Sequence, residues 1–103
     1  MRKIKRPPTH PGVIIKYDYI EPLSLSITTL AQSLDVSRIT VSKIVNERAP
    51  VTADMALRLA KVFNTTAELW IGLQKQYDLW HAEHDSSDWQ RANRLFSLEE
   101  HCA

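Results

Sequence analysis

The chain has 103 residues, of which 44% are apolar, and its formal net charge at pH 7 is +1. This length suits one domain with one modest core, and no apolar run approaches the roughly 20 residues that span a bilayer. The basic N-terminus has no apolar segment behind it and is not a signal peptide. The single cysteine, Cys102, excludes an internal disulfide, so we expect a cytoplasmic protein. With only two glycines and little β-branched alternation, an all-β fold is not expected.

The charges are unevenly distributed along the chain. Residues 1–50 carry eight basic and four acidic side chains, whereas residues 51–103 carry five basic and eight acidic ones. This asymmetry suggests two different partners, with phosphates favouring the basic half and either a basic protein or water facing the acidic half.

Residues 1–8 form a basic arm that ends in two prolines. The arm could contact phosphate, although a frayed, solvated terminus is the simpler interpretation. A first helix is expected from Thr9 to Leu23, because Pro11 suits the first helical position. Pro22 should end or bend this helix near Ile20 and Glu21. Its expected inward stripe is Ile14, Ile15, Tyr19 and Leu23.

The pattern of residues 26–46 predicts two short helices joined by a tight turn. Ser26 and Ser37 can each cap a helix, and Asp35 in the turn tolerates a left-handed backbone better than most residues. Both helices have an apolar stripe at helical spacing, made of Leu30, Ala31 and Leu34 in the first and Val41, Ile44 and Val45 in the second. This pattern predicts a helix-turn-helix unit, whose second helix enters the DNA major groove.

Two further helices follow this unit. Thr52 can cap a fourth helix that ends at Asn64, and residues 65–68 resemble a capping box that opens a fifth helix running to about Glu83. The expected apolar stripe of the fifth helix is Leu69, Trp70, Leu73, Tyr77 and Trp80, with Ile71, Leu79 and Ala82 at its flanks. One copy of a small bundle should bury Leu69, Leu73 and Tyr77 but not the whole set, so a twofold dimer is expected. The residues assigned to the dimer interface are Trp70, Tyr77, Leu79 and Trp80.

The C-terminal segment suggests a sixth helix from Ser87 to about Glu100. Near its start, the side chains of His81, His84, Asp85 and Asp88 are close enough in sequence to suggest metal binding, but their spacing matches no zinc pattern. The serines sit at predicted helix caps and no glycine-rich phosphate loop is present, so neither a catalytic site nor a cofactor is expected. The expected domains are therefore a basic arm (1–8), a helix-turn-helix domain with a dimerising fifth helix (9–84) and a helical extension (85–103).

The second helix of the helix-turn-helix unit carries the residues expected to read bases. Arg38 can donate two hydrogen bonds to guanine, Lys43 can reach a guanine or a phosphate, and Ile39 and the Thr40 methyl can contact thymine methyl groups. The residues expected to contact phosphates are Ser26, Thr28, Thr29, Gln32, Ser37, Ser42, Asn46 and Arg48. Because one such helix binds DNA weakly, a homodimer that reads a palindrome is implied.

The chain resembles the lambda-repressor-like (XRE) helix-turn-helix family in residues 30–31, 36–37 and 41–46. Residues 10–12, 21–23, 53–60, 68–74 and 77–79 look more specifically like the HigA/VapI antitoxin family. Two departures stand out: Glu47 occupies a position where the family usually has glycine, and Val13 and Tyr17 occur where it usually has acidic residues.

This resemblance implies an all-α fold: a five-helix DNA-binding domain, here followed by a short C-terminal helix. It also implies a homodimer that represses its own operon and neutralises a HigB-type mRNA endonuclease toxin. Two alternatives stay open: a stand-alone transcriptional regulator without a toxin, and a protein-interaction module that no longer binds DNA.

Overall fold

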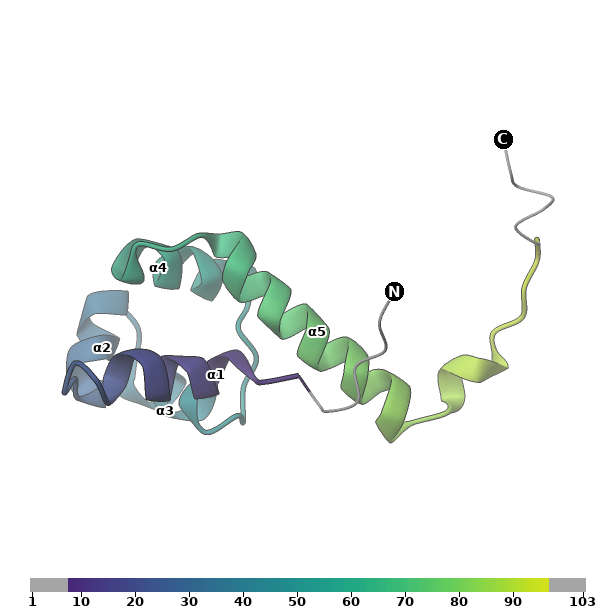
Figure 1. Ribbon diagram of the computed structural model, residues 1–103, viewed down its shortest axis with the longest axis horizontal. Helices are drawn as coiled ribbons and strands as arrows, with labels where there is room; N and C mark the ends of the chain where they lie inside the picture. Colours follow the sequence, from purple (N-terminus) through teal and green to yellow (C-terminus); the bar gives the residue numbers. More distant parts are fainter. Residues whose placement is uncertain (1–7, 97–103) are drawn as a thin grey trace.

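The computed structural model describes residues 8–96, and this part of the chain is helical without β-strands. Five α-helices are present, as expected (Figure 1). The elements are α1 (Pro11–Ile14), the π-helical segment η1 (Ile15–Ile20), α2 (Ile27–Leu34), α3 (Arg38–Val45), α4 (Ala53–Phe63), α5 (Ala67–Asp85) and the 3-10 turn η2 (Asp88–Arg91). None of these helices is long and apolar enough to cross a membrane.

Hydroxyl caps begin the four helices after η1. The side chains of Ser26, Ser37, Thr52 and Thr66 each accept a hydrogen bond from the backbone N–H three residues later, at 2.9–3.2 Å. Each cap satisfies an N–H that has no partner within its helix. The predicted capping box is off by one residue, because Thr66 caps α5 while the Thr65 hydroxyl accepts from the indole of Trp70 at 2.8 Å.

The first helix changes its winding after one turn. In η1 the backbone hydrogen bonds join residues five apart, as in the bond from the N–H of Glu21 to the carbonyl oxygen of Lys16 at 3.0 Å. Pro22, which has no N–H, follows directly, and the helix ends at Ile20 as predicted. Leu23 lies beyond that end and is 61% exposed, so its assignment to the inward stripe was wrong.

Trp70 of α5 lies fully buried in the hydrophobic core. Its ring approaches those of Tyr19 and Phe63, with centroid distances of 6.1 and 6.0 Å, and these two rings stack on each other at 4.0 Å. The other buried apolar residues are Ile15, Leu30, Ala31, Leu34, Val41, Ile44, Val45, Val51, Met55, Ala56 and Leu59. The predicted core stripes of α2 and α3 are therefore confirmed.

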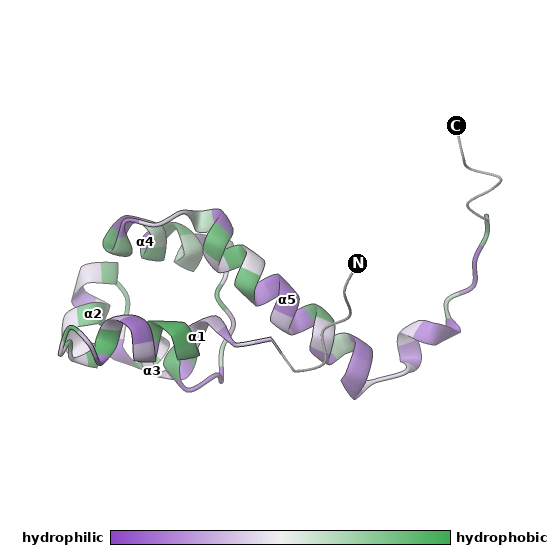
Figure 2. Ribbon diagram, in the orientation of Figure 1, coloured by the Kyte–Doolittle hydropathy of each residue, from purple (hydrophilic) through white to green (hydrophobic). Residues whose placement is uncertain are grey.

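The two halves of α5 have different surroundings. The first half packs against α4, whereas the second extends away from the other helices (Figure 1). Hydropathy follows this division, since apolar residues concentrate in the helical cluster and polar ones dominate the distal end of α5 (Figure 2). Leu69, expected in the core, is 45% exposed, because the buried side of α5 is centred on Trp70 and Gln74.

The predicted sixth helix is not formed in the described residues. Only Asp88–Arg91 makes a 3-10 turn, and Ala92 already has an extended backbone. Trp89 and Leu95 are 52% and 86% exposed, so these two side chains bury little apolar surface that would stabilise a helix here. The rest of the predicted helix lies outside the described residues, as does most of the basic arm.

Candidate nucleic-acid interface

The turn between α2 and α3 has the geometry that the sequence predicted. Asp35 adopts a left-handed conformation with φ 58° and ψ 48°, and its N–H donates to the carbonyl of Gln32 at 3.1 Å. Ser37 then caps α3. A single left-handed residue therefore ends one helix, and the chain is redirected into the next within three residues.

One side of α3 is buried and the opposite side faces solvent. With about 100° between successive residues, the buried residues Val41, Ile44 and Val45 define the inward side. The same spacing places Ile39 and Lys43 on the outward side, and both are exposed. Ile39 is 67% exposed, so its apolar side chain is accessible to a ligand.

Three cations in or just after α3 are available for a ligand. Arg38, Lys43 and Arg48 are exposed, and none forms an ion pair or side-chain hydrogen bond within residues 8–96. Thr40 differs, because its hydroxyl lies 2.8 Å from that of Ser37 in the helix cap. The methyl group of Thr40 is then the group left for an apolar contact.

The predicted phosphate contacts fall into two groups. Ser26, Thr28 and Thr29 are exposed at the start of α2, and Gln32 is exposed further along the same helix. The Ser26 hydroxyl is engaged in the cap, where it accepts from the Thr29 N–H and donates to the Thr29 hydroxyl, each at 2.9 Å. At the end of α3, Asn46 is committed to its own helix instead. Its amide donates to the carbonyl and hydroxyl oxygens of Ser42, at 2.8 and 3.3 Å.

Gly12 brings α1 against the end of α3. A Cβ atom added to Gly12 would lie 1.8 Å from the carbonyl oxygen of Ile44, so only glycine permits this approach. His10 completes the contact by capping α1, with its Nδ1 accepting from the Gly12 N–H at 2.9 Å. The sequence showed that residues 10–12 begin a helix but gave no sign of the long-range contact.

His10 is almost completely buried, with 3% of its surface exposed. Its ring meets that of Tyr77 edge-on, at a centroid distance of 4.8 Å. Burial lowers the pKa of His10 below 6.5, and the partial compensation comes from Glu47, the Ala49 backbone and Asp78. A neutral ring also fits the geometry, because a protonated Nδ1 could not accept the Gly12 N–H.

The structural role of Gln74 in α5 was not recognised from the sequence. It is 6% exposed, and its Oε1 accepts the N–H of Val51 at 2.8 Å while its amide donates to Asp78 at 2.9 Å. The loop between α3 and α4 is therefore tied to α5. A buried glutamine cannot be distinguished from a surface one by spacing alone.

The residues assigned to a dimer interface have different environments. The assignment of Trp70 was wrong, since its side chain is wholly enclosed within one copy of the chain. Tyr77 is half-buried between His10 and His81. Leu79 is 62% exposed, and Trp80 is half-buried, stacked on His84 at 3.9 Å.

The histidines near the end of α5 have contacts within the helix. His81 Nδ1 lies 3.0 Å from a carboxylate oxygen of Asp85, and His84 Nδ1 lies 2.8 Å from the Trp80 carbonyl. In the part of the chain that the structure describes, no three potential metal ligands converge.

Comparison with known proteins shows which family the chain resembles. The helix-turn-helix family profile matches residues 17–70. The uncharacterised HTH-type transcriptional regulator YbaQ of Escherichia coli strain K12 is 42% identical over 103 residues, covering 100% of this chain and 91% of that protein. Virulence-associated protein I of Dichelobacter nodosus is 42% identical over 83 residues, covering 81% of this chain and 77% of that protein.

A solved structure extends the similarity to three dimensions. Pseudomonas aeruginosa antitoxin HigA, with the higBA promoter, matches with a TM-score of 0.75 and 35% sequence identity. The match covers 86% of this chain and 99% of that chain.

Proposed function

Because this chain belongs to the lambda-repressor-like (XRE) helix-turn-helix family, together with the HigA and VapI proteins, we propose that it binds the operator of its own operon as an antitoxin and represses transcription. The family is one of DNA-binding proteins without enzymatic activity, in agreement with the expectation from the sequence. The matching HigA structure, which carries promoter DNA, supports the choice of ligand.

The exposed surface of α3 is the observation that supports this proposal most strongly. Arg38 and Lys43 provide two uncommitted cations, and Ile39 provides an apolar side chain between them in sequence. A major groove offers the matching groups: guanine O6 and N7 for the cations, and thymine methyl groups for Ile39.

Phosphate contacts would fix the orientation of α3. The start of α2 presents the exposed hydroxyl groups of Thr28 and Thr29, and Arg48 adds an exposed cation after α3. Such contacts supply affinity that depends on salt but not on sequence.

A homodimer is part of the proposal, with the distal half of α5 as its contact region. Tyr77, Leu79 and Trp80 remain candidates there, and the indole N–H of Trp80 has no hydrogen-bond partner although its nitrogen is buried. A dimer would present two copies of α3 to a palindromic operator. If Trp80→Ala leaves the dimer intact in sedimentation, this region is not the contact.

DNA binding can be tested by fluorescence anisotropy on two duplexes. One carries the DNA directly upstream of the gene, and the other is the same sequence scrambled. Specific binding by proteins of this kind exceeds nonspecific binding by about 10³-fold or more. Equal affinity for the two duplexes at the same salt concentration would refute sequence-specific recognition.

The partner we propose for the antitoxin function is a HigB-type mRNA endonuclease encoded beside this gene. Co-expression of the adjacent gene product, followed by affinity purification, should recover a stable complex and relieve the growth arrest caused by the toxin alone. An isolated gene, or a neighbour that neither binds nor arrests growth, would favour the alternative of a stand-alone regulator. That alternative draws support from YbaQ, which is described as a transcriptional regulator.

A further inference from the structure

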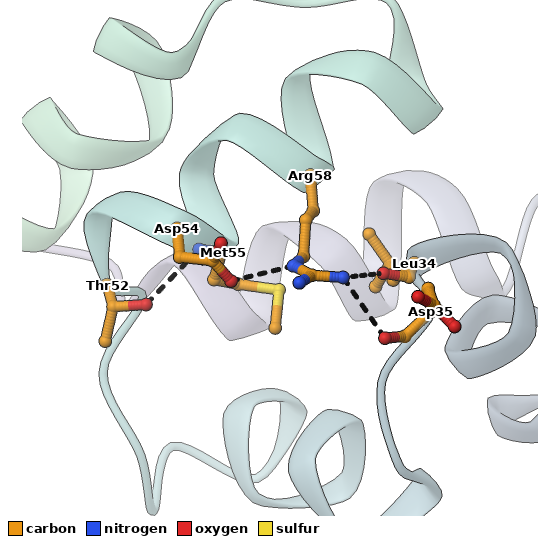
Figure 3. Close-up of polar contacts among 6 residues, drawn as sticks. All are labelled: Leu34, Asp35, Thr52, Asp54, Met55 and Arg58. Carbon is orange, nitrogen blue, oxygen red and sulfur yellow. Dashed lines mark hydrogen bonds and ion pairs between the residues drawn. The ribbon is translucent and has the colours of Figure 1, made fainter.

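Arg58 of α4 forms hydrogen bonds with the backbone at the end of α2, where the chain turns toward α3 (Figure 3). Its Nη1 donates to the carbonyl oxygens of Leu34 at 2.8 Å and Asp35 at 3.1 Å. Its Nε donates to the carboxylate of Asp54, one turn earlier on α4, at 2.7 Å. One guanidinium therefore connects α4 with the last residue of α2 and with the left-handed residue of the turn.

These carbonyls lie where the direction of α3 is set. The last carbonyls of a helix have no partner within it and carry the negative end of its dipole, so a cation is favourable there. Asp35 is the left-handed residue, and α3 begins only three residues later at Arg38. A small rotation at Asp35 would therefore swing the whole of α3.

The shape of the arginine side chain suits this position. A guanidinium presents several N–H donors in a fixed plane, so it can hold two carbonyls and one carboxylate together. Lysine carries a single nitrogen and cannot reproduce the arrangement. Asp54 leaves the guanidinium little freedom to rotate, although 35% of the Arg58 side chain is exposed.

We infer that Arg58 is a positioning residue for DNA recognition, which sets the orientation of α3 by tying α4 to the end of α2. This inference rests on the proposed DNA-binding function. It predicts that loss of Arg58 reduces discrimination between DNA sequences, because Arg38 and Lys43 then meet the base edges at the wrong angle.

The test compares Arg58→Met, Arg58→Lys and the charge control Lys61→Met in binding to the upstream and scrambled duplexes. Lys61 is an exposed cation on the same helix without an ion pair in the described residues. All measurements are made well below the unfolding temperature of each variant. Arg58→Met should weaken upstream binding by about tenfold or more, equivalent to about 1.4 kcal/mol, and change scrambled binding no more than Lys61→Met does. Arg58→Lys should lie between wild type and Arg58→Met.

A double substitution separates positioning from simple stabilisation. If Arg58 aligns α3, Arg38→Ala should cost less affinity in the Arg58→Met background than in wild type, because Arg38 is already misplaced there. Strictly additive effects would overturn the inference, because a merely stabilising contact does not change what Arg38 contributes.

The other outcomes are also decisive. If Arg58→Met lowers the unfolding temperature but leaves discrimination unchanged, the inference is wrong while the proposed function stands. If it weakens both duplexes equally and reduces the salt slope by about one, Arg58 contacts phosphate directly and the inference is again wrong. If the wild-type protein does not discriminate between the duplexes, the proposed function fails and the inference fails with it.

Discussion

Substitution of Gly12 by alanine should strongly destabilise the chain, although glycine-to-alanine changes in helices usually stabilise. The added Cβ would lie 1.8 Å from the Ile44 carbonyl oxygen and 2.7 Å from its carbon, and both are backbone atoms that cannot rotate aside. Restoring an ordinary contact of 3.4 Å requires α1 and the end of α3 to separate by about 1.6 Å.

The expected size of the effect is a difference between two opposing terms. Overpacking usually lowers the free energy of unfolding by about 1–3 kcal/mol, and a clash with backbone atoms is expected at the upper end of that range. Better helix propensity returns at most about 1 kcal/mol. The free energy of unfolding should therefore fall by about 2 kcal/mol, which lowers Tm by roughly 8–16 °C in a domain of this size.

Gly72→Ala is the matched control for this substitution. A Cβ at Gly72 would have no atom within 4 Å, so the change should add about 0.5–1 kcal/mol of stability through helix propensity alone. Urea and thermal unfolding followed by circular dichroism measure both variants. If Gly12→Ala proves as stable as wild type, or stabilises as Gly72→Ala does, α1 is not seated on α3 as described.

Three further substitutions test other features of the fold. Glu47 has φ 62°, a conformation that costs non-glycine residues about 1–2 kcal/mol. Glu47→Gly should therefore raise the free energy of unfolding by about 0.5–1 kcal/mol, measured by urea unfolding. A lower free energy of unfolding would show that the charge of Glu47 matters more than its backbone conformation. Burial lowers the pKa of His10, so the unfolded chain binds protons more readily and the free energy of unfolding falls as the pH drops below about 6.5. His10→Asn keeps a cap, and its free energy of unfolding should fall less steeply between about pH 7.5 and 5.5. Equal pH dependence in the two proteins would exclude His10 as the cause. Gln74→Leu leaves the Val51 N–H without its partner and should cost about 1–3 kcal/mol in the same unfolding assay, and an unchanged midpoint would mean that water replaces the amide.

Local features of the fold could be predicted from the sequence because they depend on neighbouring residues. A hydroxyl cap such as Ser26 or Ser37 bonds to an N–H three residues away, and the left-handed turn at Asp35 depends on the residue itself. The apolar stripe of α3 follows from helical spacing. These signals were sufficient to identify the helix-turn-helix unit and its outward surface.

The features that could not be predicted depend on contacts between distant parts of the chain. Gly12 meets Ile44, and Gln74 meets Val51, across separations that no periodicity encodes. Trp70 was wrongly placed at an interface for the same reason, because helical spacing shows that a stripe exists but not which part of it the chain itself covers.

The central claim is that the outward surface of α3 reads base pairs, and a base-by-base binding profile tests it most directly. Wild type, Arg38→Ala and Lys43→Ala would be titrated against the upstream duplex and against duplexes that each carry one base-pair change within the segment that the wild-type protein binds. We predict that Arg38→Ala costs about 1–3 kcal/mol and removes the preference at one base pair while preserving it elsewhere. An unchanged profile for both variants, with the affinity of the wild type, would contradict recognition through α3.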